Sequence, residues 1–168
     1  EARGGVVMRA PVTVGIMDQS VDDTVPDLVG QVDHDKSVSC SFNGIPNRDP
    51  AAWRWDDATH GTHVAGSIAA KHDGVGVDGV NPPRRIAGLN GASRNGGFFY
   101  PEYIVCGFVW AAEHGISVTN GSYYVDPWKY WLPNDPEQAA GQEAVQRAVD
   151  YATSKDVINV VAAGNFST

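Results

Sequence analysis

The sequence predicts a single α/β domain built around a mostly parallel β-sheet. Short runs of β-branched residues alternate with helical patterns along the chain, which is the signature of strand–helix–strand units. The 168 residues suffice for one compact core, and no internal repeat, low-complexity tract or linker divides them. We therefore interpret residues 1–168 as one domain.

The elements follow from two hydrophobic periodicities. Strands are predicted at 12–17, weakly at 29–41, and at 86–89, 116–119 and 157–163, the last as a buried strand. Helices are predicted from His60 to the glycine-rich turn at 73–79, at 104–112 and at 144–152, where apolar residues recur on one face. Loops are predicted at 42–58, 73–79, 90–97 and 127–136, which are rich in Gly, Pro, Asn or aromatic residues.

Composition excludes two classes of partner. A net charge of −8 repels phosphate backbones, so we expect no nucleic acid partner. No apolar run approaches the roughly 20 residues that cross a bilayer, so we expect no membrane partner, and residues 1–5 lack the apolar stretch of a signal peptide. Cys40 and Cys106 are compatible with one disulfide or with two buried free thiols.

Polar residues directly follow three of the predicted strands. Asp18, residues 120–122 and residues 164–165 should meet at one rim, because the carboxyl ends of parallel strands share an edge of the sheet. His60 begins the helix nearby, and a helix N-terminus favours the neutral, basic imidazole. A carboxylate bonded to the second ring nitrogen would fix the tautomer, and Asp18 suits that role. The alternative for this pair is a helix end beside an unrelated turn carboxylate.

Four segments together resemble the subtilisin-like serine peptidases. Residues 60–70 (HGTHVAGSIAA) resemble the histidine signature of that family, and residues 12–18 (VTVGIMD) with 25–28 (VPDL) resemble its aspartate segment. Residues 120–124 (NGSYY) are similar to its substrate-binding strand, and 160–165 (VVAAGN) to the segment of its oxyanion-stabilising asparagine. Among members, the YYVDPW sequence that begins at Tyr123 is most similar to secreted actinomycete enzymes.

The resemblance implies a three-layer, doubly wound, mostly parallel sheet and hydrolysis of peptide bonds through an acyl-enzyme. In that mechanism Asp18 would orient the imidazole, His60 would act as general base and then acid, and Asn165 would donate to the oxyanion. The backbone of two segments would pair with an extended peptide; the residues are Gly97, Phe98, Phe99, Ser122 and Tyr123. Ordinary packing is an equal alternative for the tyrosines. The implied partner is a polypeptide substrate or a pro-segment, and the implied location is extracellular.

The nucleophilic serine of the family is the part we do not find in these residues. The family places it in a Gly-Thr-Ser-Met-Ala-x-Pro sequence well beyond the asparagine, and Thr168 is the last residue here. The serines considered are Ser67, Ser93, Ser122, Ser154 and Ser167, none of which is predicted at a helix start. Gln19 and Ser20 also replace the family's Thr/Ser-Gly after the aspartate.

We therefore expect an incomplete N-terminal portion of a peptidase domain that is inactive alone. A second chain that carries the serine would restore activity. The alternatives are a pseudoenzyme or peptide-binding module without proteolysis, and a bare structural fragment with an exposed edge strand at 157–163.

No cofactor is required for this chemistry, but two metals are compatible with the sequence. Asp27 and the loop that begins at Asp73 resemble the family's calcium site, with the hard oxygen ligands that calcium prefers, although a solvated turn also explains Asp73. Zinc is the weaker alternative: His60 and His63 lie one helical turn apart, with Asp56 and Asp57 close in sequence, but further ligands are unspecified.

Overall fold

The computed structural model describes residues 12–55, 59–82, 85–132 and 134–165, and these form one five-stranded parallel sheet. Its strands are β1 (Thr13–Asp18), β2 (Val38–Ser39), β3 (Arg85–Asn90), β4 (Val118–Gly121) and β5 (Ile158–Val161). Their order is β2-β3-β1-β4-β5, so β1 is central and the chain crosses over it between β3 and β4. The predicted α/β class is confirmed, and the carboxyl end of β1 lies at the switch point where such folds bind ligands.

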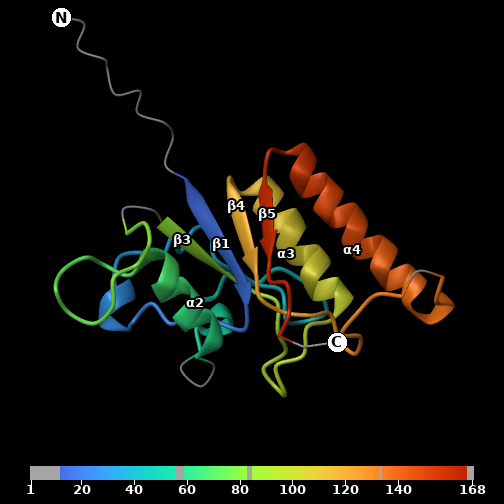
Figure 1. Cartoon of the computed structure of the whole chain (residues 1–168), viewed down its shortest axis with the longest axis horizontal. Helices are drawn as coiled ribbons and strands as arrows, with labels where there is room; N and C mark the ends of the chain where they lie inside the picture. The colour runs from blue at the N-terminus through green and yellow to red at the C-terminus, as the bar shows by residue number, and fades with distance from the viewer. Residues whose placement is uncertain (1–11, 56–58, 83–84, 133, 166–168) are drawn as a thin grey trace, which may run out of the picture.

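Helices cover both faces of the sheet (Figure 1). On one face lie α2 (His60–Ala69) and a 3₁₀ turn, η1 (Pro26–Leu28); on the other lie α3 (Pro101–Glu113) and α4 (Pro136–Ser154). Successive side chains of β1 pack alternately into the two hydrophobic cores, one on each face of the sheet. Ile16 packs in the cluster with Ala65 of α2, while Met17 packs in the cluster with Ile104 of α3. The result is three layers. No helix in the described ranges is long and apolar enough to span a bilayer.

Two details of the sequence prediction are wrong. The loop predicted at 42–58 contains a short helix, α1 (Pro50–Trp53), which begins with proline after the capping residue Asp49. The strand predicted as buried is exposed, because β5 is the outermost strand of the described sheet: Ile158 is 63% and Val161 69% exposed. An apolar run has the same pattern in a covered central strand and in an uncovered outer one.

Cys40 and Cys106 form a disulfide, which answers a question that the sequence left open. The bond ties the residue after β2 to α3, across a sequence separation of 66. Both cysteines are buried within the core between the sheet and α3. The bond therefore links the edge of the sheet at β2 to the helical layer that packs on that face.

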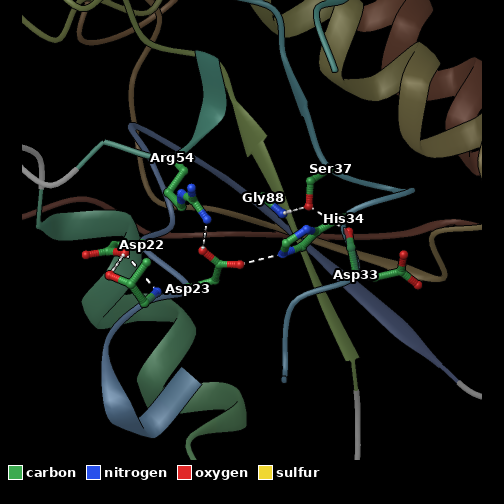
Figure 2. A network of polar contacts seen from close by, with 8 residues as sticks. Asp22, Asp23, Asp33, His34, Ser37, Arg54 and Gly88 are labelled. Carbon is green, nitrogen blue, oxygen red and sulfur yellow. Dashed lines mark hydrogen bonds and ion pairs between the residues drawn. The ribbon is translucent and has the colours of Figure 1, made fainter. Parts of the chain in front are cut away.

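A polar network braces the segment that follows β1 (Figure 2). The Asp23 carboxylate accepts a hydrogen bond from Arg54 Nη1 at 2.9 Å and contacts His34 Nε2 on its other oxygen. Nearby, the Ser37 hydroxyl accepts the Gly88 N–H at 3.0 Å and so joins this region to β3. Burial alone would raise the pKa of Asp23, but its hydrogen bonds to Arg54 and then His34 outweigh burial and lower the pKa below its usual 3.8.

Asp23→Asn is expected to destabilise the protein at neutral pH and to matter less in acid. Because folding lowers the pKa of Asp23, its stabilising contribution is present above pH 4 and is lost as pH falls through the folded value. Losing hydrogen bonds to charged groups costs about 1.5–3 kcal/mol at pH 7. Circular dichroism melts between pH 7 and pH 3 check this, with Asp35→Asn as control because Asp35 is 96% exposed in its ion pair with Arg48. A difference in melting temperature that does not shrink in acid would contradict the assignment.

Candidate active site

The predicted site residues meet around one cavity of about 720 Å³ at the carboxyl ends of β1 and β4. The residues predicted to carry chemistry or to bind substrate that line it are Asp18, His60, Gly97, Phe98, Phe99, Ser122, Tyr123 and Asn165. They come from segments far apart in the sequence. The carboxyl ends of the strands therefore bring these residues to one place in the fold.

Asp18 and His60 are in direct contact at the N-terminus of α2. His60 Nδ1 lies 2.9 Å from both carboxylate oxygens of Asp18. Asp18 is 1% exposed and also accepts the N–H of Gln19 at 2.7 Å, so its position is fixed. A carboxylate only accepts hydrogen bonds, so the neutral imidazole carries its proton on Nδ1 and leaves Nε2 as a base. No hydrogen bond joins His60 Nε2 to the described part of the chain.

Gly61 allows α2 to begin this close to β1. A Cβ atom on Gly61 would lie 2.1 Å from the Ser20 carbonyl oxygen and 3.0 Å from Asp18 Cβ, which no side chain tolerates. The next residue, Thr62, accepts the Asp22 N–H on its hydroxyl at 2.9 Å. The first turn of α2 is therefore pressed against the strand end and tied to it, which holds the imidazole on the carboxylate.

The opposite wall comes from the segment after β5. The Ala162 N–H donates to the Gly121 carbonyl at 3.0 Å, so this segment continues alongside β4 and brings Asn165 to the cavity with its side chain exposed. Between the walls, Tyr123 stacks on Phe99 with ring centroids 4.8 Å apart. Burial first, and then the Asp18 charge, raise the pKa of the Tyr123 phenol, which therefore stays protonated.

The backbone groups available to a peptide are fewer than the sequence suggested. Ser93 engages both the N–H and the carbonyl of Phe98, and Asp126 does the same for Phe99. By contrast, within the described residues no hydrogen bond engages the Gly97 carbonyl or the backbone of 122–124. The residues that carry the remaining groups all line the cavity. An extended peptide could pair with these, while Phe98 and Phe99 contribute side chains only.

Four of the serines considered in the sequence lie within the described residues, and each hydroxyl is engaged in a local hydrogen bond. The Ser67 hydroxyl donates to the His63 carbonyl within α2, Ser93 to Asn95, and Ser154 to Tyr151 at the end of α4. Ser122 lines the cavity, but its hydroxyl accepts from Asn120 Nδ2 at 3.3 Å. Ser167 lies outside the described residues.

Several lining residues were not predicted from the sequence. They are Gln19, Gly96, Asp126, Lys129 and Tyr130, whereas Tyr124 and residues 162–164 belong to segments that the sequence had already connected with the site. The aromatic cluster at 123–131 was the available signal for part of this wall, and Gln19 was visible as the residue after Asp18. The Gln19 side-chain amide lies over Gly97, because a Cβ atom on Gly97 would be 2.8 Å from Gln19 Nε2.

A family model described as the subtilase family, peptidase S8, matches residues 9–168. The chain belongs to the subtilase family. Fervidolysin from Fervidobacterium pennivorans is 34% identical over 160 residues, which are 92% of this chain and 20% of that protein. Subtilisin E from Bacillus subtilis (strain 168) is 29% identical over 154 residues, which are 92% of this chain and 34% of subtilisin E.

Solved structures agree with the subtilase fold. Sphericase superposes with a TM-score of 0.73 at 24% identity, over 96% of this chain and 50% of sphericase. MycP1 with its N-terminal propeptide removed superposes with a TM-score of 0.60 at 26% identity, over 95% of this chain and 45% of that one. This subtilase chain thus spans half or less of the length of these proteins.

The metal candidates of this subtilase differ in their surroundings. Asp27 accepts the Val77 N–H at 3.2 Å, and a Cβ atom on Gly76 would lie 2.3 Å from its other oxygen, so the loop backbone is packed against this carboxylate. Asp73 accepts the Val75 N–H at 3.1 Å and is exposed. No group of three His, Cys, Asp or Glu that could hold a metal gathers within the described residues; Asp56 and Asp57 of the zinc alternative lie outside them.

Proposed function

We propose that this chain is the Asp- and His-bearing part of a serine endopeptidase. The observation that supports it most is the contact of the buried Asp18 carboxylate with His60 Nδ1, at the edge of a cavity that Asn165 also lines. The hydroxyl to be activated would come from a serine beyond these residues, on a continuation of the chain or on a second chain.

In the proposed reaction the serine oxygen attacks the peptide carbonyl while His60 Nε2 takes its proton. His60 then returns that proton to the leaving amine, which yields an acyl-enzyme that water hydrolyses by the same two proton transfers. Asp18 stabilises the imidazolium, and the Asn165 amide would donate to the oxyanion. A donor of this kind contributes on the order of 3 kcal/mol to transition-state stabilisation.

The proposed partner is an extended polypeptide, either a substrate or a pro-segment. The unengaged Gly97 carbonyl and the backbone of 122–124 support this, because a peptide strand binds through such groups on both sides. The likeness to subtilisins supports an extracellular location, and the similarity of Tyr123 and the following residues to secreted actinomycete enzymes remains a prediction.

A fluorophosphonate probe tests the assignment of the serine. The polypeptide of residues 1–168 is expected to remain unlabelled, because the four serine hydroxyls described above are engaged in local hydrogen bonds. Fused in place of the matching segment of fervidolysin, the same residues are expected to support labelling of a serine in the fervidolysin part. Labelling of a serine within residues 1–168 would contradict the proposal, as would an unlabelled but folded chimera.

The second candidate function is peptide binding without cleavage, which the same unengaged backbone groups favour. Titration of the folded chimera with an extended peptide separates the two functions. Binding followed by turnover supports the endopeptidase, whereas saturable binding with no cleavage product supports the binding module.

A structural calcium ion at Asp27 is also proposed. The carboxylate with carbonyls of the loop packed on it would offer the oxygen ligands that calcium prefers, while Asp73 would support that loop through Val75. Calcium at a hundred times its dissociation constant should then stabilise folding by about 2.7 kcal/mol. Thermal melts in calcium and in EGTA check this. Asp27→Asn should remove the difference and Asp73→Asn should keep it, because the amide oxygen still accepts the Val75 N–H; equal melts of the parent chain would contradict the site.

A further inference from the structure

Asp126 holds Phe99 at two points, and both residues line the main cavity at the carboxyl ends of β1 and β4. The Asp126 N–H donates to the Phe99 carbonyl at 2.7 Å, and the Asp126 carboxylate accepts the Phe99 N–H on Oδ2, also at 2.7 Å. A hydrogen bond to a carboxylate is stronger than one between two neutral groups. The segment after β4 is therefore clamped to the segment before α3 at the wall of this cavity.

A pair of stacked rings joins the same two segments a second time. The centroids of the Phe99 and Tyr123 rings lie 4.8 Å apart, with an angle of 12° between the ring planes. The Tyr123 hydroxyl in turn donates to Met17 Sδ at 3.0 Å. Met17 precedes Asp18 in β1, so the two clamped segments are anchored on the strand that carries the partner of the imidazole.

The clamped segments are the ones that carry the backbone groups of the proposed peptide site. These groups belong to residues 97–99 and 122–124, all of which line the cavity. Ser93 holds the backbone of Phe98 in a similar way, but it lies only five residues away in the same loop. Asp126 differs because its contact bridges a sequence separation of 27. It therefore fixes one segment relative to the other.

We propose that Asp126 is a positioning residue for peptide binding, which keeps residues 97–99 and 122–124 in the arrangement that one extended peptide requires. Without its carboxylate, the Phe99 N–H loses its acceptor and the two segments gain freedom relative to each other. A peptide that has to order its own binding groups binds more weakly, because the loss of their freedom opposes binding. The inference rests on the proposed binding of an extended polypeptide, and it adds the residue that holds the site in shape.

Binding of a blocked, fluorescently labelled hexa-alanine peptide to residues 1–168 tests this by fluorescence anisotropy. Asp126→Ala should weaken binding about tenfold, because one hydrogen bond to a charged group no longer orders the site. Asp126→Asn should bind within about threefold of the parent, since the amide oxygen still accepts the Phe99 N–H. Asp150→Ala is the matched control: Asp150 is exposed on α4, accepts a hydrogen bond from Gln146 and does not line the cavity.

Hydrogen exchange of the Phe99 amide, followed by NMR, measures the clamp without a peptide. This amide should exchange slowly in the parent and in Asp126→Asn, and faster in Asp126→Ala. The Gly97 N–H donates to the Ser93 carbonyl within its own loop and should keep its protection in all three proteins. Fast exchange of the Phe99 amide in the parent would overturn the clamp, whether or not Asp126→Ala folds.

The outcomes separate this inference from the function on which it rests. Equal affinity of the parent and a folded Asp126→Ala variant overturns the positioning role and leaves peptide binding standing. Binding that is lost equally in Asp126→Asn, with the Phe99 amide still protected, also overturns it, because Asp126 would then act on the peptide directly. Failure of hexa-alanine to bind a cooperatively melting parent overturns the proposed polypeptide binding and this inference with it.

Discussion

His60→Ala should lower peptide hydrolysis by about 10⁶-fold in the fervidolysin chimera, and Asp18→Asn by about 10⁴-fold. Without the imidazole, the serine proton loses the base that the contact of His60 with Asp18 holds in place. The Asp18 carboxylate lies 2.9 Å from His60 Nδ1. Without its negative charge, neither the neutral imidazole protonated on Nδ1 nor the imidazolium is stabilised. Initial rates on a fluorogenic peptide measure both losses.

His63→Ala is the matched control for these two variants. His63 is an exposed histidine on α2, one turn from His60, and it does not line the main cavity. The His63→Ala chimera should keep a hydrolysis rate within about twofold of the parent chimera, because surface substitutions of this kind have small effects. A His60→Ala chimera that retains a tenth of the parental rate would show that the base lies elsewhere.

Removing the Cys40–Cys106 disulfide should destabilise the fold by about 4 kcal/mol. The sequence separation of 66 residues sets the loop that the bond closes in the unfolded chain, and a loop of this size gives that value in the chain-entropy model. For a domain of this length the loss corresponds to a fall in melting temperature of about 10 °C. The double variant Cys40→Ala, Cys106→Ala, compared with the oxidised and reduced parent, checks it by thermal denaturation.

The reduced parent and the double variant should both melt well below the oxidised parent, since both lack the same covalent link. Because both sulfurs are buried in the core next to α3, alanine also removes some packing, and the variant is expected to lie slightly below the reduced parent. Identical melting of the oxidised and reduced parent would contradict a stabilising disulfide.

The central part of the site could be predicted because it depends on local rules. Asp18 ends the central strand and His60 begins a helix, and both positions follow from patterns that extend over a few residues. Parallel strands then bring the segment at Asn165 to the same rim. The direction of the strands predicts the shared position of these residues, whereas their catalytic roles were implied by the resemblance to the subtilisin-like peptidases.

Other features depend on distances that a pattern does not contain. The pairing of Cys40 with Cys106 and the stacking of Arg94 on Trp55 join segments through the fold, and no local periodicity reports them. The exposure of β5 depends on what covers the outer strand of the sheet, which its own apolar residues do not reveal. The helix α1 could have been predicted from the sequence, because Asp49 followed by Pro50 is a helix-start signal.

The protonation pattern of the His60 ring can be measured by ¹⁵N NMR on residues 1–168, and this measurement needs no serine. At a pH where the imidazole is neutral, we expect a proton on Nδ1, held by the Asp18 carboxylate, and an unprotonated Nε2. Asp18→Asn should remove that preference. A neutral ring protonated mainly on Nε2 in the parent protein would contradict the proposed base and the function built on it.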